Sequence, residues 1–333
     1  MTQAPGPFGA ASGDAALEAS VRSGLASVEA LLHETVKSDV DFVTRASRHL
    51  VDAGGKRFRP LLVLLAAHFG DPEAPGVVPS AVVVELTHLA TLYHDDVMDE
   101  ADVRRGAMSA NARWDNTVAI LTGDFLFARA SDILADLGPE AVRLQARTFE
   151  RLVTGQIRET VGPVGDEDPV DHYLSVLADK TGSLIATSGR FGSMLSGAGE
   201  TAVDVLTNFG ERIGVAFQLS DDLLDVTSET SVSGKTPGTD LREGIPTLPV
   251  LLARRAARPE DARLLDLLAS DLAADADLAE ALRLLRANPA VPQAQEEVRR
   301  WAEEARTVLA PLPEGAPKDA LAALCDQVVG RAV

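Results

Sequence analysis

Apolar residues recur every three or four positions along most of this chain, which is the spacing of one face of an α-helix. The first such stripe begins after Asp14 and continues to Leu32. A second helix is predicted over residues 40–51, and the glycine pair Gly54-Gly55 that follows is typical of a helix end. Helical spacing therefore dominates the N-terminal part of the chain.

The same periodicity continues toward the C-terminus. Helices are predicted over about 109–137, 139–161 and 201–226, and shorter amphipathic helices follow residue 247. No segment shows a convincing period-two strand pattern or an Asn-Gly hairpin signal. The pattern predicts an all-α fold. Residues 1–13, rich in glycine and proline, are expected to form a disordered tail before a single domain over 14–333.

Two apolar helices end in clusters of aspartate. The first cluster is Asp95, Asp96 and Asp99, and the second is Asp221, Asp222 and Asp225. On a helix, Asp95 and Asp99 share one face, with Asp96 beside them. Crowded carboxylates need cations, and oxygen ligands suit Mg²⁺, which usually bridges to substrate phosphates. A diphosphate held through metal is therefore the predicted ligand.

A single Asp-Asp-x-x-Asp motif would be explained more simply as a solvated acidic face. The second copy changes that balance, because both copies follow long apolar stretches and have apolar residues between the acids. These carboxylates are accordingly expected at buried helix positions. Since no linker separates the two motifs, we expect them to face each other across a deep central cavity in one large helical bundle.

Several cations could meet an anion near these motifs. Lys56, Arg57 and Arg59 follow the glycine pair and precede an apolar run, which favours an anion site over a plain basic loop. His88, two turns before the first cluster, is either a phosphate ligand or a core residue. Lys180 lies in an otherwise apolar helix, so it either extends to the surface or meets an anion.

Composition narrows the choice of function. The chain has 333 residues, 46% of them hydrophobic, which is enough for a large core. The net charge of −19 argues against nucleic-acid binding, which requires basic surfaces. One cysteine, Cys325, cannot form an internal disulfide and fits a reducing compartment. With no secretory signal and no apolar run long enough to span a bilayer, a soluble cytoplasmic protein is expected.

An ordered series of motifs, from about residue 50 to 250, resembles the trans-isoprenyl diphosphate synthases, also called polyprenyl synthetases. The matching pieces are Gly54 to Pro60, His88 to Asp99, Arg104-Arg105-Gly106, Thr122-Gly123-Asp124, Lys180-Thr181-Gly182, Phe217-Gln218 with Asp221 to Asp225, and Gly234-Lys235 with Gly238, Asp240-Leu241 and Thr247-Leu248-Pro249. One such motif is a weak signal, but the ordered set is highly specific. The N-terminal tail and the C-terminal part add little to the match.

The resemblance implies a helical bundle around a tunnel, with Mg²⁺ and two diphosphates at its mouth. It implies about three Mg²⁺ ions once the allylic diphosphate is bound, held by Asp95 and Asp99 with Asp96 in support, and by Asp221 with Asp222 and Asp225. It assigns the diphosphate of isopentenyl diphosphate to Lys56, Arg59, His88 and Arg105. It assigns the allylic diphosphate to Arg104, Lys180 and Lys235, and the space around the allylic cation to Thr181 and Gln218.

The implied reaction is a head-to-tail condensation of isopentenyl diphosphate with an allylic diphosphate. Cations and metal stabilise the charge that builds on the departing diphosphate. The double bond of isopentenyl diphosphate attacks the allylic cation, and a proton is then lost to the diphosphate. No side-chain nucleophile is needed, which agrees with the lack of a convincing Ser/His/Asp or Cys/His arrangement. The family is typically homodimeric, and a homodimer is expected here.

Product length is expected to depend on the tunnel wall. In this family the fifth residue before the first motif limits length when it is bulky; here it is Ala90, with Thr91 beside it and Thr87 one turn deeper. Because none of these is aromatic, a product longer than farnesyl is predicted, of the medium- or long-chain type that forms quinone side chains. Geranylgeranyl is the alternative product, since Phe125 or Phe127 could close the tunnel from another helix.

One position departs from the family pattern, and two other functions compete. Family members often have lysine where this chain has Ile245, so one outer contact to the allylic diphosphate is expected to be weaker. A class I terpene cyclase would need no isopentenyl diphosphate site and would usually show an Asn/Ser/Glu second motif. A non-catalytic partner subunit would tend to lose its acidic motifs, and both are intact here.

Overall fold

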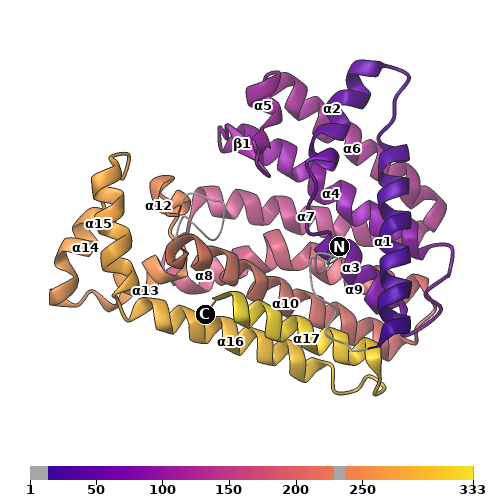
Figure 1. Ribbon diagram of the computed structural model, residues 1–333. Coiled ribbons are helices and arrows are strands. Elements are labelled where there is room, and N and C mark those ends of the chain that lie inside the picture. Colours follow the sequence, from indigo (N-terminus) through magenta and orange to yellow (C-terminus); the bar gives the residue numbers. More distant parts are fainter. Residues whose placement is uncertain (1–13, 229–236, 333) are drawn as a thin grey trace, which may run out of the picture. The chain divides into compact units, whose positions relative to one another are not determined.

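The computed structural model describes residues 14–228 and 237–332. Within these ranges helices make up nearly all the regular structure, and the strands β1 (Val103–Arg104) and β2 (Ala107–Met108) form one short antiparallel hairpin (Figure 1). The prediction of an all-α fold is confirmed. The predicted disordered tail, residues 1–13, lies outside the described residues.

The described residues cluster into two compact units. The first comprises 14–150, 184–210 and 311–323, and the second comprises 151–183, 211–228, 237–310 and 324–332. Each unit contains one of the two acidic clusters. The predicted single domain over 14–333, with one cavity between the clusters, stays a prediction.

The first unit is built around α4 (Val77–Met98), the helix that ends in the first acidic cluster. Its other elements are α1 (Ala15–Thr35), α2 (Asp41–Asp52), α3 (Phe58–Ala67), α5 (Ala110–Arg113), α6 (Asn116–Leu137), the first half of α7 (Pro139–Val161), most of α9 (Ser183–Leu195), the start of α10 (Glu200–Thr227) and the start of α17 (Ala316–Ala332). α4 packs against α1, α3 and most extensively α6, and most of its residues are buried. A helix that is apolar nearly all round suits this central position.

Close packing of α6 on α4 depends on Gly123. A Cβ atom at this position would lie 2.3 Å from His94 Nε2 and 3.0 Å from the Ala90 carbonyl oxygen. Because backbone atoms of a packed helix cannot move aside, a side chain here would push the two helices apart. The glycine therefore fixes α6 against the last turns of α4, just before the first acidic cluster.

The second unit carries the second acidic cluster on α10. Its elements are the second half of α7, α8 (Pro169–Leu177), the π-helical turn η1 (Ala178–Gly182), most of α10, α12 (Thr239–Arg242), α13 (Leu248–Ala256), η2 (Pro259–Asp261), α14 (Ala262–Leu268), α15 (Asp275–Arg286), α16 (Ala290–Val308) and the end of α17. α13 packs against α8, α14, α15 and α16.

Two elements differ from their predictions. The helix expected over about 109–137 is broken after Arg113, because the Asp115 carboxylate accepts the Val118 N–H at 2.8 Å and caps a new helix, α6. The helix expected around Lys180 is interrupted by the wider turn η1. Elsewhere the described helices agree with the periodicity.

In the described part of the chain, no helix combines the length and the apolar character that crossing a bilayer requires.

Candidate functional site

The three carboxylates of the first acidic cluster have different surroundings. Asp96 is fully buried, with Oδ1 2.5 Å from Arg104 Nε; its Oδ2 has no hydrogen-bond partner within the described chain. Burial raises the pKa of Asp96, and the charge of Arg104 partly offsets that rise. Asp95 is half-buried, and Asp99 is the C-cap of α4 with a side chain 45% exposed. The expectation of a wholly buried cluster is therefore wrong for Asp99, because the helix ends there.

A tight turn places two arginines next to this cluster. Arg105 and Gly106 have positive φ angles of 53° and 76°, as a two-residue turn between β1 and β2 requires. Arg104, just before the turn, has Nη2 3.7 Å from Asp99 Oδ2 and so contacts two carboxylates of the cluster. Arg105 instead donates hydrogen bonds to two backbone carbonyl oxygens near the end of α2. Gly55 leaves room for it, since a Cβ there would lie 3.0 Å from the Arg105 guanidinium carbon.

A buried carboxylate, Glu85, organises the cations of the first unit. Its Oε1 lies 2.8 Å from Arg57 Nη1 and 4.0 Å from Arg105 Nη2, and its side chain is only 2% exposed. Arg57 also pairs with Glu29 and donates to a backbone carbonyl. These contacts hold the Arg57 side chain in the interior. Arg57 therefore does not contribute to the anion site that was predicted for it together with Lys56 and Arg59.

Three further residues of the first unit were predicted to bind an anion: Lys56, Arg59 and His88. Lys56 is exposed, whereas Arg59 and His88 are partly buried. Burial lowers the pKa of Arg59 to about 10, and Glu85 partly offsets that effect. Burial, together with the positive charges of Arg59 and Arg105, holds the pKa of His88 well below its usual value. His88 is therefore neutral at neutral pH and has one ring N–H that can donate a hydrogen bond to an anion.

The second acidic cluster repeats the division between buried and partly exposed aspartates. Asp222 is buried and accepts hydrogen bonds from the Tyr173 hydroxyl and, at 2.8 Å, from Gln218 Nε2. Burial raises the pKa of Asp222 to about 6, against the lowering effect of these two hydrogen bonds. Asp221 and Asp225 are half-buried. The Asp221 carboxylate pairs with an arginine of α17, and that of Asp225 accepts backbone N–H groups of α12.

The turn η1 adds two predicted site residues to this cluster. Thr181 Oγ1 donates to Gln218 Oε1 at 3.2 Å, so Thr181, Gln218 and Asp222 form one hydrogen-bonded row. Lys180 Nζ lies 2.6 Å from Glu159 Oε2 on α7. Of the two alternatives for this lysine, the structure favours an anionic partner, here a carboxylate.

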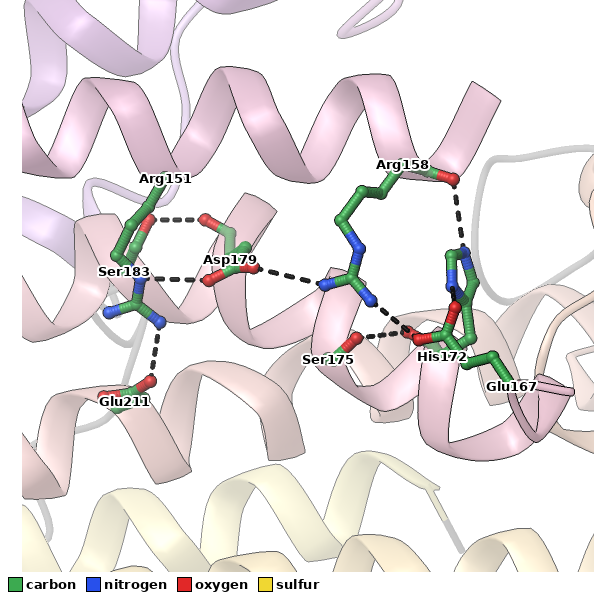
Figure 2. A network of polar contacts seen from close by, with 8 residues as sticks. All are labelled: Arg151, Arg158, Glu167, His172, Ser175, Asp179, Ser183 and Glu211. Carbon is green, nitrogen blue, oxygen red and sulfur yellow. Dashed lines mark hydrogen bonds and ion pairs between the residues drawn. The ribbon is translucent and has the colours of Figure 1, made fainter. Parts of the chain in front are cut away.

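Arginines of α7 hold the residue before Lys180. Figure 2 shows Asp179 between Arg151 and Arg158, with distances of 2.9 and 3.6 Å to the two guanidinium groups. Arg151 also contacts Glu211 on α10 at 2.7 Å. Because Asp179 is tied on two sides, the π-helical turn has a fixed position between α7 and α10.

The residues predicted to control product length lie inside the first unit. Ala90 and Thr87 have no exposed surface, and Thr91 is half-buried. Thr87 Oγ1 accepts a hydrogen bond from Gln145 Nε2 of α7 at 2.8 Å. Phe127 packs against another phenylalanine, of α7, with 4.5 Å between ring centroids. Thr87 on α4 therefore has a polar contact with α7, and Phe127 on α6 has an aromatic contact with α7.

Two further residues of the predicted site, Lys235 and Ile245, follow the second acidic cluster in sequence. Lys235 lies outside the described residues, so its contact with the allylic diphosphate stays a prediction. Ile245 is 38% exposed, and its N–H donates to the Asp240 carbonyl at 2.8 Å. Its backbone is therefore held in place while its side chain lies partly at the surface.

Three residues that contact the site residues were not predicted from the sequence: Glu85, Tyr173 and Arg331. Glu85 is the one carboxylate in the apolar stretch of α4 that precedes the acidic cluster. A carboxylate among apolar residues predicts a buried cation partner, so a signal was present. Tyr173 and Arg331 lie 49 and 110 residues from the aspartates that they contact. Local spacing carries no information about partners so far apart.

The chain matches the family model described as Polyprenyl synthetase over residues 40–285, a range that contains both acidic clusters. The chain belongs to the polyprenyl synthetase family. The resemblance carried by the ordered motifs is thereby confirmed.

Similar polyprenyl synthetases differ in the products for which they are named. Nonaprenyl diphosphate synthase of Mycobacterium tuberculosis is 51% identical over 320 residues, which is 96% of each chain. A crystal structure of geranylgeranyl pyrophosphate synthase from Corynebacterium glutamicum, complexed with calcium and isoprenyl diphosphate, has a TM-score of 0.87 and 48% identity over 96% of this chain and 98% of that one. A decaprenyl diphosphate synthase from Rhodobacter capsulatus has the same TM-score, with 33% identity over 96% and 99% of the two chains.

The donor sets of this polyprenyl synthetase fit a divalent metal. Among the described residues, no three Asp, Glu, His or Cys side chains form a ready metal cage. Mg²⁺ does not require one, because one or two carboxylates usually bind it together with substrate phosphates and water. Each cluster offers two aspartates that are at least partly exposed and one that is buried: Asp95 and Asp99 with Asp96, and Asp221 and Asp225 with Asp222.

Proposed function

We propose that the protein is a trans-polyprenyl diphosphate synthase, which adds isopentenyl diphosphate head to tail to an allylic diphosphate with Mg²⁺ in the cytoplasm. The observation that carries the proposal is the repeated pairing of partly exposed aspartates with nearby cations in a chain of the polyprenyl synthetase family. Two intact acidic clusters also disfavour a non-catalytic partner subunit. The basic residues around Glu85 disfavour a terpene cyclase, which has no second diphosphate to bind.

In this proposal each of the two diphosphates is bound by its own set of basic residues. The diphosphate of isopentenyl diphosphate is bound by Lys56, Arg59, His88 and Arg105. His88 acts as a neutral N–H donor, because its pKa is held low. The allylic diphosphate is bound by Arg104, Lys180 and Lys235, of which Arg104 is already positioned by two carboxylates.

The aspartates hold the metal, and a hydrogen-bonded row supports the cation. When bound, about three Mg²⁺ ions act as Lewis acids on the departing diphosphate; their proposed ligands are Asp95, Asp99, Asp221 and Asp225. Asp96 and Asp222, both buried, orient their neighbours. The Thr181 hydroxyl and the Gln218 carbonyl are fixed by their mutual hydrogen bond, so their dipoles stabilise the allylic cation without reorganisation.

We propose a product longer than farnesyl, of the medium- or long-chain type. This is supported by the small side chains of Ala90 and Thr87 and by relatives that are named for nonaprenyl and decaprenyl products. Geranylgeranyl diphosphate is the second candidate, because the similar Corynebacterium glutamicum structure carries that name and Phe127 is packed in the same unit.

Product analysis tests this proposal. Purified protein is incubated with isopentenyl diphosphate, Mg²⁺ and, separately, dimethylallyl, geranyl, farnesyl and geranylgeranyl diphosphates, with a chelator control, and the products are analysed by mass spectrometry. A chelator-sensitive ladder of longer prenyl diphosphates supports the proposal, and its last member decides between the two product classes. If folded protein extends none of the four primers, the proposed function is wrong.

Enlarging Ala90 is expected to shorten the product. Ala90→Phe places an aromatic ring on the wall of α4, so elongation stops earlier and the product spectrum shifts to fewer isoprene units. Because a ring in a fully buried position costs about 1–3 kcal/mol in overpacking, the melting temperature is measured beside the mass spectrum, and Ala90→Leu serves as a milder variant. A folded Ala90→Phe protein with the wild-type spectrum would place the length limit elsewhere.

Removing the Tyr173 hydroxyl is expected to change the pH dependence of activity. Tyr173→Phe deletes a donor to ionised Asp222, so the pKa of that carboxyl rises further above its usual range. The acid limb of kcat/KM should move up by about one pH unit, since one hydrogen bond contributes about 1 kcal/mol. Tyr93→Phe is the matched control, because Tyr93 bonds to the Ala46 carbonyl and not to Asp222. An acid limb that moves equally in both variants would contradict this role.

We also propose that the protein forms a homodimer through α7. This helix exposes Val142, Val153, Ile157 and Val161 along one side, an apolar face that water disfavours. Sedimentation analysis of the wild type and of Ile157→Glu tests the idea. A dimeric wild type and a more dissociated variant are expected, whereas a monomeric wild type would refute the proposal.

A further inference from the structure

The end of α17 brings Arg331 to the second acidic cluster. Its Nη2 donates to Asp221 Oδ1, and its guanidinium carbon lies 4.8 Å from the centroid of the Phe217 ring. Phe217 and Asp221 are four residues apart on α10, so they form one face of that helix. The arginine therefore lies along this face, held by an ion pair and a cation–π contact.

The ion pair between Arg331 and Asp221 is partly shielded from water. The side chains of Arg331 and Asp221 are 23% and 32% exposed. The Nη1 atom of Arg331 is buried and has no hydrogen-bond partner among the described residues. The guanidinium thus has one buried donor, Nη1, without an acceptor in the described part of the chain, while Nη2 pairs with Asp221. A buried unsatisfied donor costs free energy, and the ion pair with Asp221 offsets that cost.

We propose that Arg331 is an internal counter-ion of Asp221 that competes with divalent metal for this carboxylate. This inference rests on the proposed function, in which Asp221 is a metal ligand. In the metal-free protein the arginine offsets the crowding of Asp221 against Asp222. When metal binds, the Asp221 oxygen exchanges Arg331 for the metal ion, and the freed guanidinium can donate to the diphosphate that arrives with it. Arg331 is thus a positioning residue that sets how much metal the enzyme needs.

The predicted consequence is tighter metal binding when the arginine is removed. Arg331→Gln abolishes the competing charge but keeps a polar side chain of similar length. A partly exposed ion pair contributes about 1 kcal/mol, so the dissociation constant for metal should fall about fivefold. Arg331→Lys keeps the charge and should restore most of the wild-type value, although it loses the planar contact with Phe217.

Metal binding is measured without turnover. The full chain is titrated with Mn²⁺ in the presence of inorganic pyrophosphate, and free Mn²⁺ is followed by electron paramagnetic resonance. Arg306→Gln is the matched control, because it removes the same charge from an ion pair with Asp326 of α17, which is 72% exposed. This variant should bind Mn²⁺ like the wild type. Circular dichroism confirms that each variant is folded.

A variant at Asp221 separates this inference from the proposed function. Asp221→Asn should weaken Mn²⁺ binding, and adding Arg331→Gln to it should have no further effect, because the two residues act on one another. If Asp221→Asn weakens binding but Arg331→Gln leaves it unchanged or weaker, the counter-ion inference is overturned and the metal ligand stands. If Asp221→Asn binds Mn²⁺ like the wild type, Asp221 is not a metal ligand. The counter-ion inference and the metal role proposed for Asp221 then both fail.

Discussion

Asp95→Ala and Asp221→Ala should each lower turnover by about a thousandfold or more while leaving the protein folded. Each change removes one proposed metal ligand, and electrostatic stabilisation of a departing group is commonly the largest contribution to catalysis. Neither aspartate is fully buried, so its loss leaves no core cavity. The measurement is the single-turnover rate with saturating isopentenyl and allylic diphosphates, with far-UV circular dichroism on the same samples.

The control for these variants is Asp132→Ala. Asp132 is 75% exposed on α6 and its contact with Arg129 spans 3.6 Å, so its removal should leave the rate unchanged. Raising the Mg²⁺ concentration should recover part of the lost activity in Asp95→Ala and Asp221→Ala, because the remaining ligands still bind metal weakly. A folded Asp95→Ala or Asp221→Ala protein with the wild-type rate would remove that residue from the metal site.

Local periodicity accounts for how much of the fold could be predicted. Both acidic clusters lie at or near the ends of the helices on which the sequence places them, because apolar spacing and helix length are encoded in neighbouring residues. The break before Asp115 and the π-helical turn around Lys180 were not predicted, since each depends on a single local contact or on packing against another helix. Periodicity predicts that a segment as a whole is helical, but it does not show where the helix is interrupted.

The roles of individual site residues were harder to predict, because burial depends on partners far away in sequence. Asp96 and Asp99 are chemically identical, yet one is fully buried against Arg104 and the other caps a helix at the surface. Arg57 and Arg59 are two positions apart, and of the two Arg57 forms the ion pair with Glu85. Spacing places these residues near each other, and long-range contacts decide which of them remain available to a ligand.

Breaking the Arg57–Glu85 pair is the change expected to cost the most stability. Arg57 is 7% and Glu85 2% exposed, so Arg57→Ala removes the closest cationic partner of a buried carboxylate and leaves it with Arg105 at 4.0 Å and the charge of Arg59. Removing one member of a buried ion pair commonly costs about 3–5 kcal/mol, because the other charge is left in a medium of low polarity. Arg57 also adopts a left-handed backbone conformation, φ 49°, which its side-chain contacts stabilise.

Urea unfolding of Arg57→Ala, followed by circular dichroism, should therefore show a midpoint well below that of the wild type. Arg300→Ala is the control, because Arg300 forms exposed pairs with Glu297 and Glu304 and should cost less than about 1 kcal/mol. Adding Glu85→Gln to Arg57→Ala should recover part of the loss, because it removes the buried negative charge that has lost its closest partner. A midpoint for Arg57→Ala within error of Arg300→Ala would mean that the remaining cations, Arg105 at 4.0 Å and Arg59, are sufficient to compensate the charge of Glu85.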